Sequence, residues 1–357
     1  VARAGVRGEE VQDICVGNVL QAGGGAVMAR MAQLTAGIPY TTALATTNRQ
    51  CSSGLQAIAN VYAAIRAGVV EVGIGAGVES MSTNSMADVT PTVDWEVVRE
   101  TKAAWDCTVP MGVTSDAIAD KYGVTRAAQD AFAARSHARA AAAAASGAFA
   151  DETVPVTTAA GEVVAGDDGI RADTTVAKLA RLAPAFTEAG TTTAGNSSQV
   201  SDGAAAALLM RRAAATARGL RPLGVMRSYV VVGVPPDEMG IGPAAAIPPA
   251  VAAAGLTLDD IDVFEINEAF ASQLLYCVRA LGLGPDLDAG GDRVNPLGGA
   301  IALGHPLGAT GARQAAALLS HLRRTGKRYG VVSMCIGTGM GAAAVFENEA
   351  GARRRRA

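Results

Sequence analysis

The sequence has 357 residues, half of which are hydrophobic, while charged residues make up 18% and the formal net charge is -3. A chain of this length exceeds one ordinary hydrophobic core and suits about two or three domains. The small net charge gives no sign of the basic surface that attracts nucleic-acid phosphates, and no apolar stretch reaches the roughly 18 residues of a membrane-spanning helix. We therefore expect a globular protein without a nucleic-acid partner or a membrane span.

Strand and helix patterns alternate along the first 82 residues. Leu55, Ile58, Tyr62 and Ile65 recur at the spacing of one helix face, and Gly68 is the residue type expected just beyond a helix end. The remaining elements expected here are Ile14–Val19, Ala26–Ala36, Ala43–Thr47 and Val69–Ile74, the last closing in a turn at Gly75 and Gly77.

Cys51 lies between the Ala43–Thr47 run and this helical pattern. At a helix N-terminus the free N–H groups and the helix dipole favour a thiolate, so Cys51 is a candidate nucleophile. Taken alone, a cysteine is more often a small buried residue at a tight turn. The other chemically capable residues of the sequence decide between these two interpretations.

Between residues 83 and 190 the composition shifts toward Thr, Asp and Pro. An alanine-rich helix at Arg126–Ser146 lies within this stretch, and Thr125 is its expected N-cap. Asp202–Met210 then has the pattern of a strand that returns to the first unit. We expect a first half at 1–82 and 191–212, an inserted loop domain at 83–190, a second half at 213–349 and a tail at 350–357.

The second half repeats the order of elements in the first. A helix, a glycine, a β-run and a glycine-rich turn follow one another around both Gly68 and Gly326. The sequence thus predicts two duplicated α/β halves, each with a mainly parallel sheet covered by helices. Leu223–Val234 resembles a strand that opens the second half, and the first half has no equivalent. We expect this first strand to be missing from the first half, and we expect its place to be central.

Three glycine-bounded turns of the second half each contain a residue that can do chemistry. Asn267 follows one strand pattern, His305 lies in a glycine-dense loop before a helix, and Cys335 ends another strand pattern. Because ligands gather at the carboxyl ends of parallel strands, we expect these groups to meet Cys51 in one pocket. The five cysteines form no Cys-x-x-Cys pair, which argues against zinc.

These motifs resemble those of the thiolase family, specifically the 3-ketoacyl-CoA thiolases of peroxisomal type. The resemblance spans Asp13 to Glu347, nearly the whole sequence. It implies two α/β halves in a layered α-β-α-β-α arrangement, with a loop domain that covers coenzyme A. The matching motifs are Asn48–Gln56, Gly195–Ser198, Asn267–Ala271, Gly298–Gly311 and Cys335–Gly339.

The resemblance implies acyl transfer through a thioester on Cys51. His305 resembles the base that removes the Cys51 proton, and Cys335 resembles the acid that protonates the acetyl-CoA enolate and then activates incoming CoA. His305 and a water held by Asn267 would form one oxyanion hole, and the backbone N–H groups of Cys51 and Gly337 would form the other. Five further positions resemble substrate and CoA contacts: Met111, Arg171, Ser198, Met239 and Phe270.

The implied reaction is thiolytic cleavage of a 3-ketoacyl-CoA by CoA in fatty acid β-oxidation, with CoA as a substrate and no cofactor or metal. Val-Pro-Met-Gly at 109–112 stands where biosynthetic acetoacetyl-CoA thiolases carry His-Met-Gly, which favours the degradative class. The resemblance also implies a homodimer or tetramer in the peroxisome or cytoplasm, although the sequence does not end in the peroxisomal address Ser-Lys-Leu.

Three alternatives stay open at this point. An acetoacetyl-CoA-forming thiolase is a close relative of the favoured class. A β-ketoacyl synthase also uses a cysteine on this fold, but it would use two histidines or a His/Asn pair, and Cys335 argues against it. An inactive thiolase-like subunit is favoured by the missing strand and disfavoured by the intact set of Cys51, His305 and Cys335.

Overall fold

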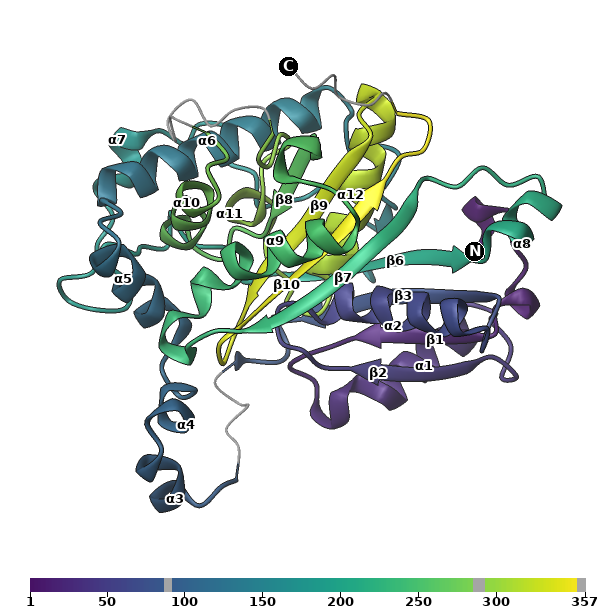
Figure 1. Ribbon diagram of the computed structural model, residues 1–357, viewed down its shortest axis with the longest axis horizontal. Coiled ribbons are helices and arrows are strands. Elements are labelled where there is room, and N and C mark those ends of the chain that lie inside the picture. Colours follow the sequence, from purple (N-terminus) through teal and green to yellow (C-terminus); the bar gives the residue numbers. More distant parts are fainter. Residues whose placement is uncertain (87–91, 285–292, 352–357) are drawn as a thin grey trace.

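The computed structural model describes residues 1–86, 92–284 and 293–351. Two four-stranded sheets form the centre of the protein, and a largely helical segment extends to one side (Figure 1). Most of the expected tail, residues 352–357, lies outside the described residues. No helix in the described part of the chain is both long and apolar enough to cross a membrane.

The first sheet has its strands in the order β2-β1-β3-β6. β1 runs parallel to both β2 and β3, whereas β6 is antiparallel to β3. The parallel strands therefore all end at one edge of the sheet, and the chain leads from β2 at that edge to Cys51. The strands are β1 (Asp13–Gly17), β2 (Ala43–Thr47), β3 (Val72–Ser80) and β6 (Asp202–Met210).

The second sheet has the order β7-β10-β9-β8. β8 and β9 are parallel, so Asn267 and Cys335 come to the same end of this sheet. α8 (Arg212–Ala217) connects the two halves. The strands are β7 (Val225–Gly233), β8 (Val263–Ile266), β9 (Tyr329–Ile336) and β10 (Met340–Glu347).

Helices and sheets alternate in five layers. α2 (Ser53–Ala67) and α12 (Thr310–Thr325) lie between the sheets, where Leu55 and Leu318 belong to one buried cluster. The second sheet buries its other face against α9 (Gly242–Ala253) and α10 (Ala271–Ala280). α1 (Ala26–Thr35) and the N-terminal residues cover the outer face of the first sheet. The expected α-β-α-β-α arrangement is thus the observed one.

The helix after Cys51 ends as the sequence predicts. Its apolar positions face the core, with Leu55 fully buried and Ile58 nearly so. Gly68 follows the last turn with φ 78°, the left-handed conformation that ends many helices.

The chain between β3 and β6 is largely helical and lies beside the second sheet (Figure 1). Its longest helix, α6 (Arg126–Ala145), starts where predicted because the Thr125 hydroxyl accepts a hydrogen bond from the Ala128 N–H at 3.2 Å. α3 and α4 project away from the body of the protein (Figure 1). The other elements of this segment are α3 (Trp95–Glu100), α4 (Lys102–Asp106), α5 (Met111–Lys121), α7 (Val176–Leu179), β4 (Val156–Thr157) and β5 (Val163–Val164).

Two expectations about the strands are wrong. The second sheet is not mainly parallel, because the short turn between β9 and β10 reverses the chain and β10 pairs antiparallel with both neighbours. The strand that opens the second half, β7, lies at the sheet edge and not at its centre. In the first sheet all neighbours pair directly with no central gap, and among the described strands β6 pairs only with β3.

Gly75 and Gly77 lie inside β3 instead of forming the expected turn. A Cβ at Gly75 would come within 2.6 Å of the Ile58 Cα, and one at Gly77 within 2.0 Å of the Gly308 carbonyl oxygen. Because glycine has no Cβ, α2 and the loop after His305 can pack directly against the backbone of β3.

Candidate active site

Cys51 lies in a tight turn between β2 and α2. The preceding residue, Gln50, has φ 48°, which is uncommon for a residue with a side chain and marks a constrained backbone. The turn is held by the Ser53 hydroxyl, which accepts the Arg49 N–H at 2.9 Å and donates to the Gln50 carbonyl at 2.7 Å. These hydrogen bonds hold the backbone around Cys51 in one conformation.

The Cys51 thiol lies against backbone N–H groups from both halves of the chain. The N–H groups of Gly337 and of Cys51 itself hydrogen bond to the sulfur. Cys51 is only 3% exposed, and its burial raises the pKa of the thiol to about 11 although these hydrogen bonds oppose the rise. The N–H groups near the start of the helix thus lower the pKa of the thiol, as expected, but loss of solvation outweighs them.

His305 is oriented by two side chains. Its Nδ1 lies 2.6 Å from the Thr310 hydroxyl and its Nε2 lies 3.2 Å from the Asn267 amide nitrogen. Since the Asn267 amide nitrogen donates, Nε2 is the acceptor and the ring proton sits on Nδ1. The Thr310 hydroxyl in turn donates to the Pro306 carbonyl at 3.0 Å. His305 thus presents an unprotonated Nε2.

Burial and the Arg313 charge lower the pKa of His305 to about 3. The imidazole is therefore neutral at physiological pH and can accept a proton. Asn267 has its side-chain oxygen buried with no hydrogen-bond partner among the described residues, so this oxygen is available to a water or a substrate group.

Cys335 is the second-last residue of β9 and is fully buried. Burial raises the pKa of its thiol well above the ordinary value, and the charge of a Cys51 thiolate raises it further. The turn after Cys335 lies beside the Cys51 turn, because a Cβ added at Gly337 would lie 3.6 Å from the side-chain oxygen of Gln50. Gly337 follows two residues later in the turn, and a Cβ added there would lie 3.7 Å from the Met111 sulfur.

Three of the predicted substrate contacts surround Cys335. Met239 and Phe270 belong to one buried cluster with Cys335, and Met111 packs against that cluster. Met239 comes from the 3-10 helix Pro236–Ile241, Phe270 from the turn before α10, and Met111 from the start of α5. The structure therefore brings these residues to the site from three separate segments.

Ser198 is joined to the site through the backbone. Its N–H donates to the Ala269 carbonyl at 3.0 Å, next to Phe270. Arg171 lies farther out: its side chain is exposed, its N–H donates to His137 Nδ1 at 3.2 Å, and its guanidinium contacts the Gly169 carbonyl. Among the described contacts, none joins Arg171 to Cys51, His305 or Cys335.

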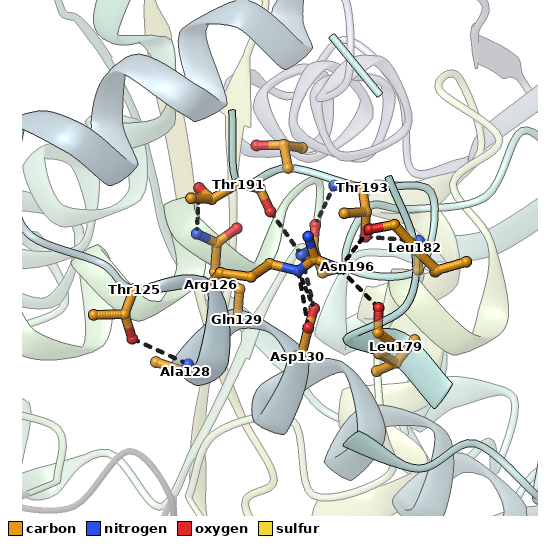
Figure 2. A network of polar contacts seen from close by, with 12 residues as sticks. Thr125, Arg126, Ala128, Gln129, Asp130, Leu179, Leu182, Thr191, Thr193 and Asn196 are labelled. Atoms are coloured by element: carbon orange, nitrogen blue, oxygen red, sulfur yellow. Dashed lines mark hydrogen bonds and ion pairs between the residues drawn. The ribbon is translucent and has the colours of Figure 1, made fainter. Parts of the chain in front are cut away.

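A buried polar network fastens the inserted segment to this side of the site (Figure 2). Asn196 donates to the Asp130 carboxylate at 3.0 Å and to the Thr191 carbonyl at 3.1 Å. Arg126 binds the same carboxylate at 2.8 Å. The Asn196 carbonyl accepts the Ala271 N–H at 2.9 Å, directly after Phe270. The network therefore connects α6 to the turn that carries Asn267 and Phe270.

Sequence reasoning missed two groups that orient the site. Thr310 holds the His305 ring, and its only signal is its place five residues later, at the start of the following helix. Glu79 is a buried carboxylate at the end of β3, and its partners become visible only in the folded protein. No cluster of three or more His, Cys, Asp or Glu side chains in the described ranges is arranged to hold a metal ion.

The chain matches two family models. The thiolase N-terminal domain matches residues 1–213 and the thiolase C-terminal domain matches residues 220–348. The peroxisomal 3-ketoacyl-CoA thiolase of Homo sapiens is 57% identical over 351 residues, covering 96% of this chain and 81% of the relative. Peroxisomal 3-ketoacyl-CoA thiolase 2 of Arabidopsis thaliana is 54% identical over 364 residues, covering 97% of this chain and 76% of the relative.

Solved structures give the same result. The dimeric peroxisomal thiolase of Saccharomyces cerevisiae superposes with a TM-score of 0.90 at 47% identity, covering 95% of this chain and 85% of that one. The human mitochondrial 3-ketoacyl-CoA thiolase in complex with CoA gives a TM-score of 0.86 at 37% identity, with 97% and 89% covered. The similarity thus extends over both sheets and the inserted segment.

Proposed function

Because this chain belongs to the thiolase family, we propose that it is a 3-ketoacyl-CoA thiolase, which cleaves a 3-ketoacyl-CoA with CoA into acetyl-CoA and a shortened acyl-CoA. The observation that carries this function is that the turn after Cys335 lies beside the Cys51 turn, where the Gly337 N–H from the other half of the chain interacts with the Cys51 sulfur. One sulfur can act as the nucleophile. The other can donate a proton to the carbon that leaves and can later accept the proton of the CoA thiol.

In the first step Cys51 becomes acylated. Nε2 of His305 takes the thiol proton as the sulfur attacks the 3-keto carbon. The resulting alkoxide collapses, the bond between carbons 2 and 3 breaks, and its electron pair moves to carbon 2. Cys335 gives its proton to that carbon, which releases acetyl-CoA and leaves a Cys335 thiolate. The raised pKa of Cys335 suits this role, because the thiol keeps its proton until a strong base such as carbon 2 forms beside it.

In the second step CoA removes the acyl group. The Cys335 thiolate accepts the proton of the CoA thiol, and the CoA sulfur attacks the thioester carbonyl. The N–H groups of Cys51 and Gly337, which interact with the Cys51 sulfur, would bind the oxyanion of this intermediate. Expulsion of Cys51 and return of the proton from His305 restore the starting state.

The keto oxygen needs a separate site during the first step. His305, once protonated on Nε2, and a water held by the unpartnered Asn267 oxygen supply that site. The apolar cluster of Met111, Met239 and Phe270 accommodates the uncharged part of the acyl-CoA. Ser198 contacts the pantetheine, and the exposed Arg171 guanidinium is free to face the adenine end of CoA. No cofactor or metal takes part in these steps.

A homodimer in the peroxisome is the assembly and location that we assign. The outer edge of β2 has no strand beside it in the described residues, and α1 exposes a row of apolar side chains next to it. Together they form a surface that a second copy can cover. The row consists of Val27, Met28, Met31 and Leu34, which are 68%, 58%, 61% and 46% exposed.

The proposed function is tested by thiolysis with purified protein. The acyl-CoA shortened by two carbons should form from a 3-ketoacyl-CoA only when CoA is present. Without CoA, at most one acetyl-CoA per site should be released, and the acyl group should stay on Cys51. Protein that is folded and yet releases neither product from short, medium or long 3-ketoacyl chains would contradict this function.

A further inference from the structure

The carboxylate of Glu79 lies at the seam between the two halves. Glu79 is 1% exposed, and each of its two oxygens accepts two N–H groups. The donors are the Asn18 amide at 3.3 Å and the Leu20 N–H at 3.1 Å on one oxygen, and the Val19 N–H at 3.0 Å and the Gly308 N–H at 2.9 Å on the other.

These donors belong to the segments on either side of the nucleophile. Residues 18–20 follow β1 in the first half, whereas Gly308 lies three residues after His305 in the second half. Val19 and Leu307 pack against Cys51 in one small buried cluster, and the Val19 carbonyl accepts the Asn48 amide at 3.2 Å. One carboxylate thus connects the Cys51 turn with the His305 loop.

The seam around Glu79 is packed backbone to backbone. A Cβ at Gly308 would come within 2.5 Å of the Val78 carbonyl oxygen and 2.8 Å of the Gly17 carbonyl oxygen. A Cβ at Gly54, in the first turn of α2, would come within 2.7 Å of the Gly308 carbonyl oxygen. No side chain fits between these segments, so the position of the loop depends on which groups bind its backbone.

We propose that Glu79 is a positioning residue that holds the His305 loop against Cys51, so that Nε2 of His305 reaches the thiol. This role rests on the proposed function above and adds to it a residue that touches neither substrate nor the reacting atoms. The Gly308 N–H is the direct link, because it binds the same oxygen as the Val19 N–H beside Cys51.

A carboxylate is required here because all four donors are N–H groups. A glutamine would offer one oxygen, and its NH2 group would face two of the N–H donors without an acceptor. The Gly308 or Leu20 segment would then have to move. The carboxylate charge has a second, opposite influence on the nucleophile: it is one of the causes that raise the pKa of Cys51.

These two influences can be separated by alkylation of Cys51 with iodoacetamide near neutral pH, followed by mass mapping of the Cys51 peptide. The reaction needs no CoA substrate, and mapping separates Cys51 from the exposed Cys107. Four proteins form a double-mutant cycle: the wild type, Glu79→Gln, His305→Ala and the double variant.

In the wild-type background we expect Glu79→Gln to slow alkylation of Cys51 by about tenfold or more, because the base is displaced. In the His305→Ala background the same change should leave the rate equal or raise it, because only the charge effect remains. An equal slowing in both backgrounds, or no slowing in the wild type, would overturn the proposal. A variant that is merely less stable changes both rates alike.

Asp262→Asn is the matched control. Asp262 is another buried carboxylate that accepts backbone N–H groups, from Arg328 at 2.9 Å and Tyr329 at 3.0 Å, where β9 begins and thus far from Cys335 at its end. Its removal should leave Cys51 alkylation unchanged. If Glu79→Gln does not fold, Glu79→Asp takes its place, because it keeps the charge and shortens the side chain. We expect Glu79→Asp to slow Cys51 alkylation in the wild-type background alone. Equal slowing in both backgrounds would again overturn the proposal.

Thiolysis gives an independent readout. Glu79→Gln should lower kcat by a similar factor with KM for CoA within about twofold, since no CoA contact changes. Inactive wild-type protein would overturn the proposed function, whereas the alkylation cycle would still decide the role of Glu79.

Discussion

The backbone N–H of Gly337 binds the sulfur of Cys51, although the two residues belong to opposite halves of the chain. Cys51 follows a strand of the first sheet and Gly337 follows β9 of the second. The proposed oxyanion site would therefore be completed only when the halves dock. The role proposed for Cys51 and for the groups around it can be tested directly.

Replacing Cys51 with Ala should abolish thiolysis, with a loss of at least about 10³-fold, because no other thiol is placed to form the thioester. Incubation of the wild type with acetyl-CoA and peptide mapping should find the acetyl group on Cys51. Cys107→Ser, at the exposed cysteine, serves as the control and should keep its activity. An acetyl group on Cys335 with Cys51 unmodified would refute the assignment.

The pH dependence of Cys51 alkylation should differ between the wild type and His305→Ala. With a pKa of about 3, His305 stays a neutral base across the neutral range, so the wild-type rate should change little there. Without it, only the thiolate reacts. The rate should then rise about tenfold per pH unit toward the raised pKa of about 11. Parallel pH profiles for the two proteins would contradict the role of His305 as base.

Thr310→Val should lower kcat by about tenfold and leave KM nearly unchanged, because the His305 ring loses its Nδ1 partner and can rotate. Thr310→Ser keeps the hydroxyl and should recover most of the activity. Steady-state kinetics of the two variants provide the comparison. Equal activity of the Val and Ser variants would mean that the hydroxyl does not orient the ring.

Asp130→Ala should destabilise the protein by about 3 kcal/mol, because it removes the carboxylate that Arg126 binds and one of the two acceptors of the buried Asn196 amide. The Asp130 side chain is 1% exposed and that of Arg126 is 24% exposed, so water replaces the lost contacts only in part. Urea unfolding measures the change. Glu10→Gln, in the more exposed ion pairs with Arg7 and Arg218, should change the stability much less.

Met31→Lys should weaken self-association, because it places a charge in the apolar row of α1 next to the outer edge of β2. Sedimentation or light scattering should detect a shift toward monomer at a given concentration. Val154→Lys, at a side chain of similar exposure in the inserted segment, is the control and should leave the assembly unchanged. An unchanged dimer in Met31→Lys would place the interface elsewhere.

The sequence by itself determined the local elements and the candidate residues for the chemistry. The helix after Cys51, its Gly68 end and the Thr125 cap depend on spacing and residue types within a few neighbouring positions, so they can be recognised without the fold. The turns that carry Asn267, His305 and Cys335 could be recognised for the same reason, because glycine and strand patterns bound each of them.

Only the tertiary structure decided what depends on contacts between distant segments. The edge position of β7 and the antiparallel pairing of β10 follow from how strands dock, not from their own residues. Gly75 and Gly77 lie inside β3 because α2 and a loop from the other half press against the strand there. The raised pKa of Cys51 likewise reflects burial by residues such as Val19 and Leu307, whose removal of water outweighs the local N–H groups that the sequence could indicate.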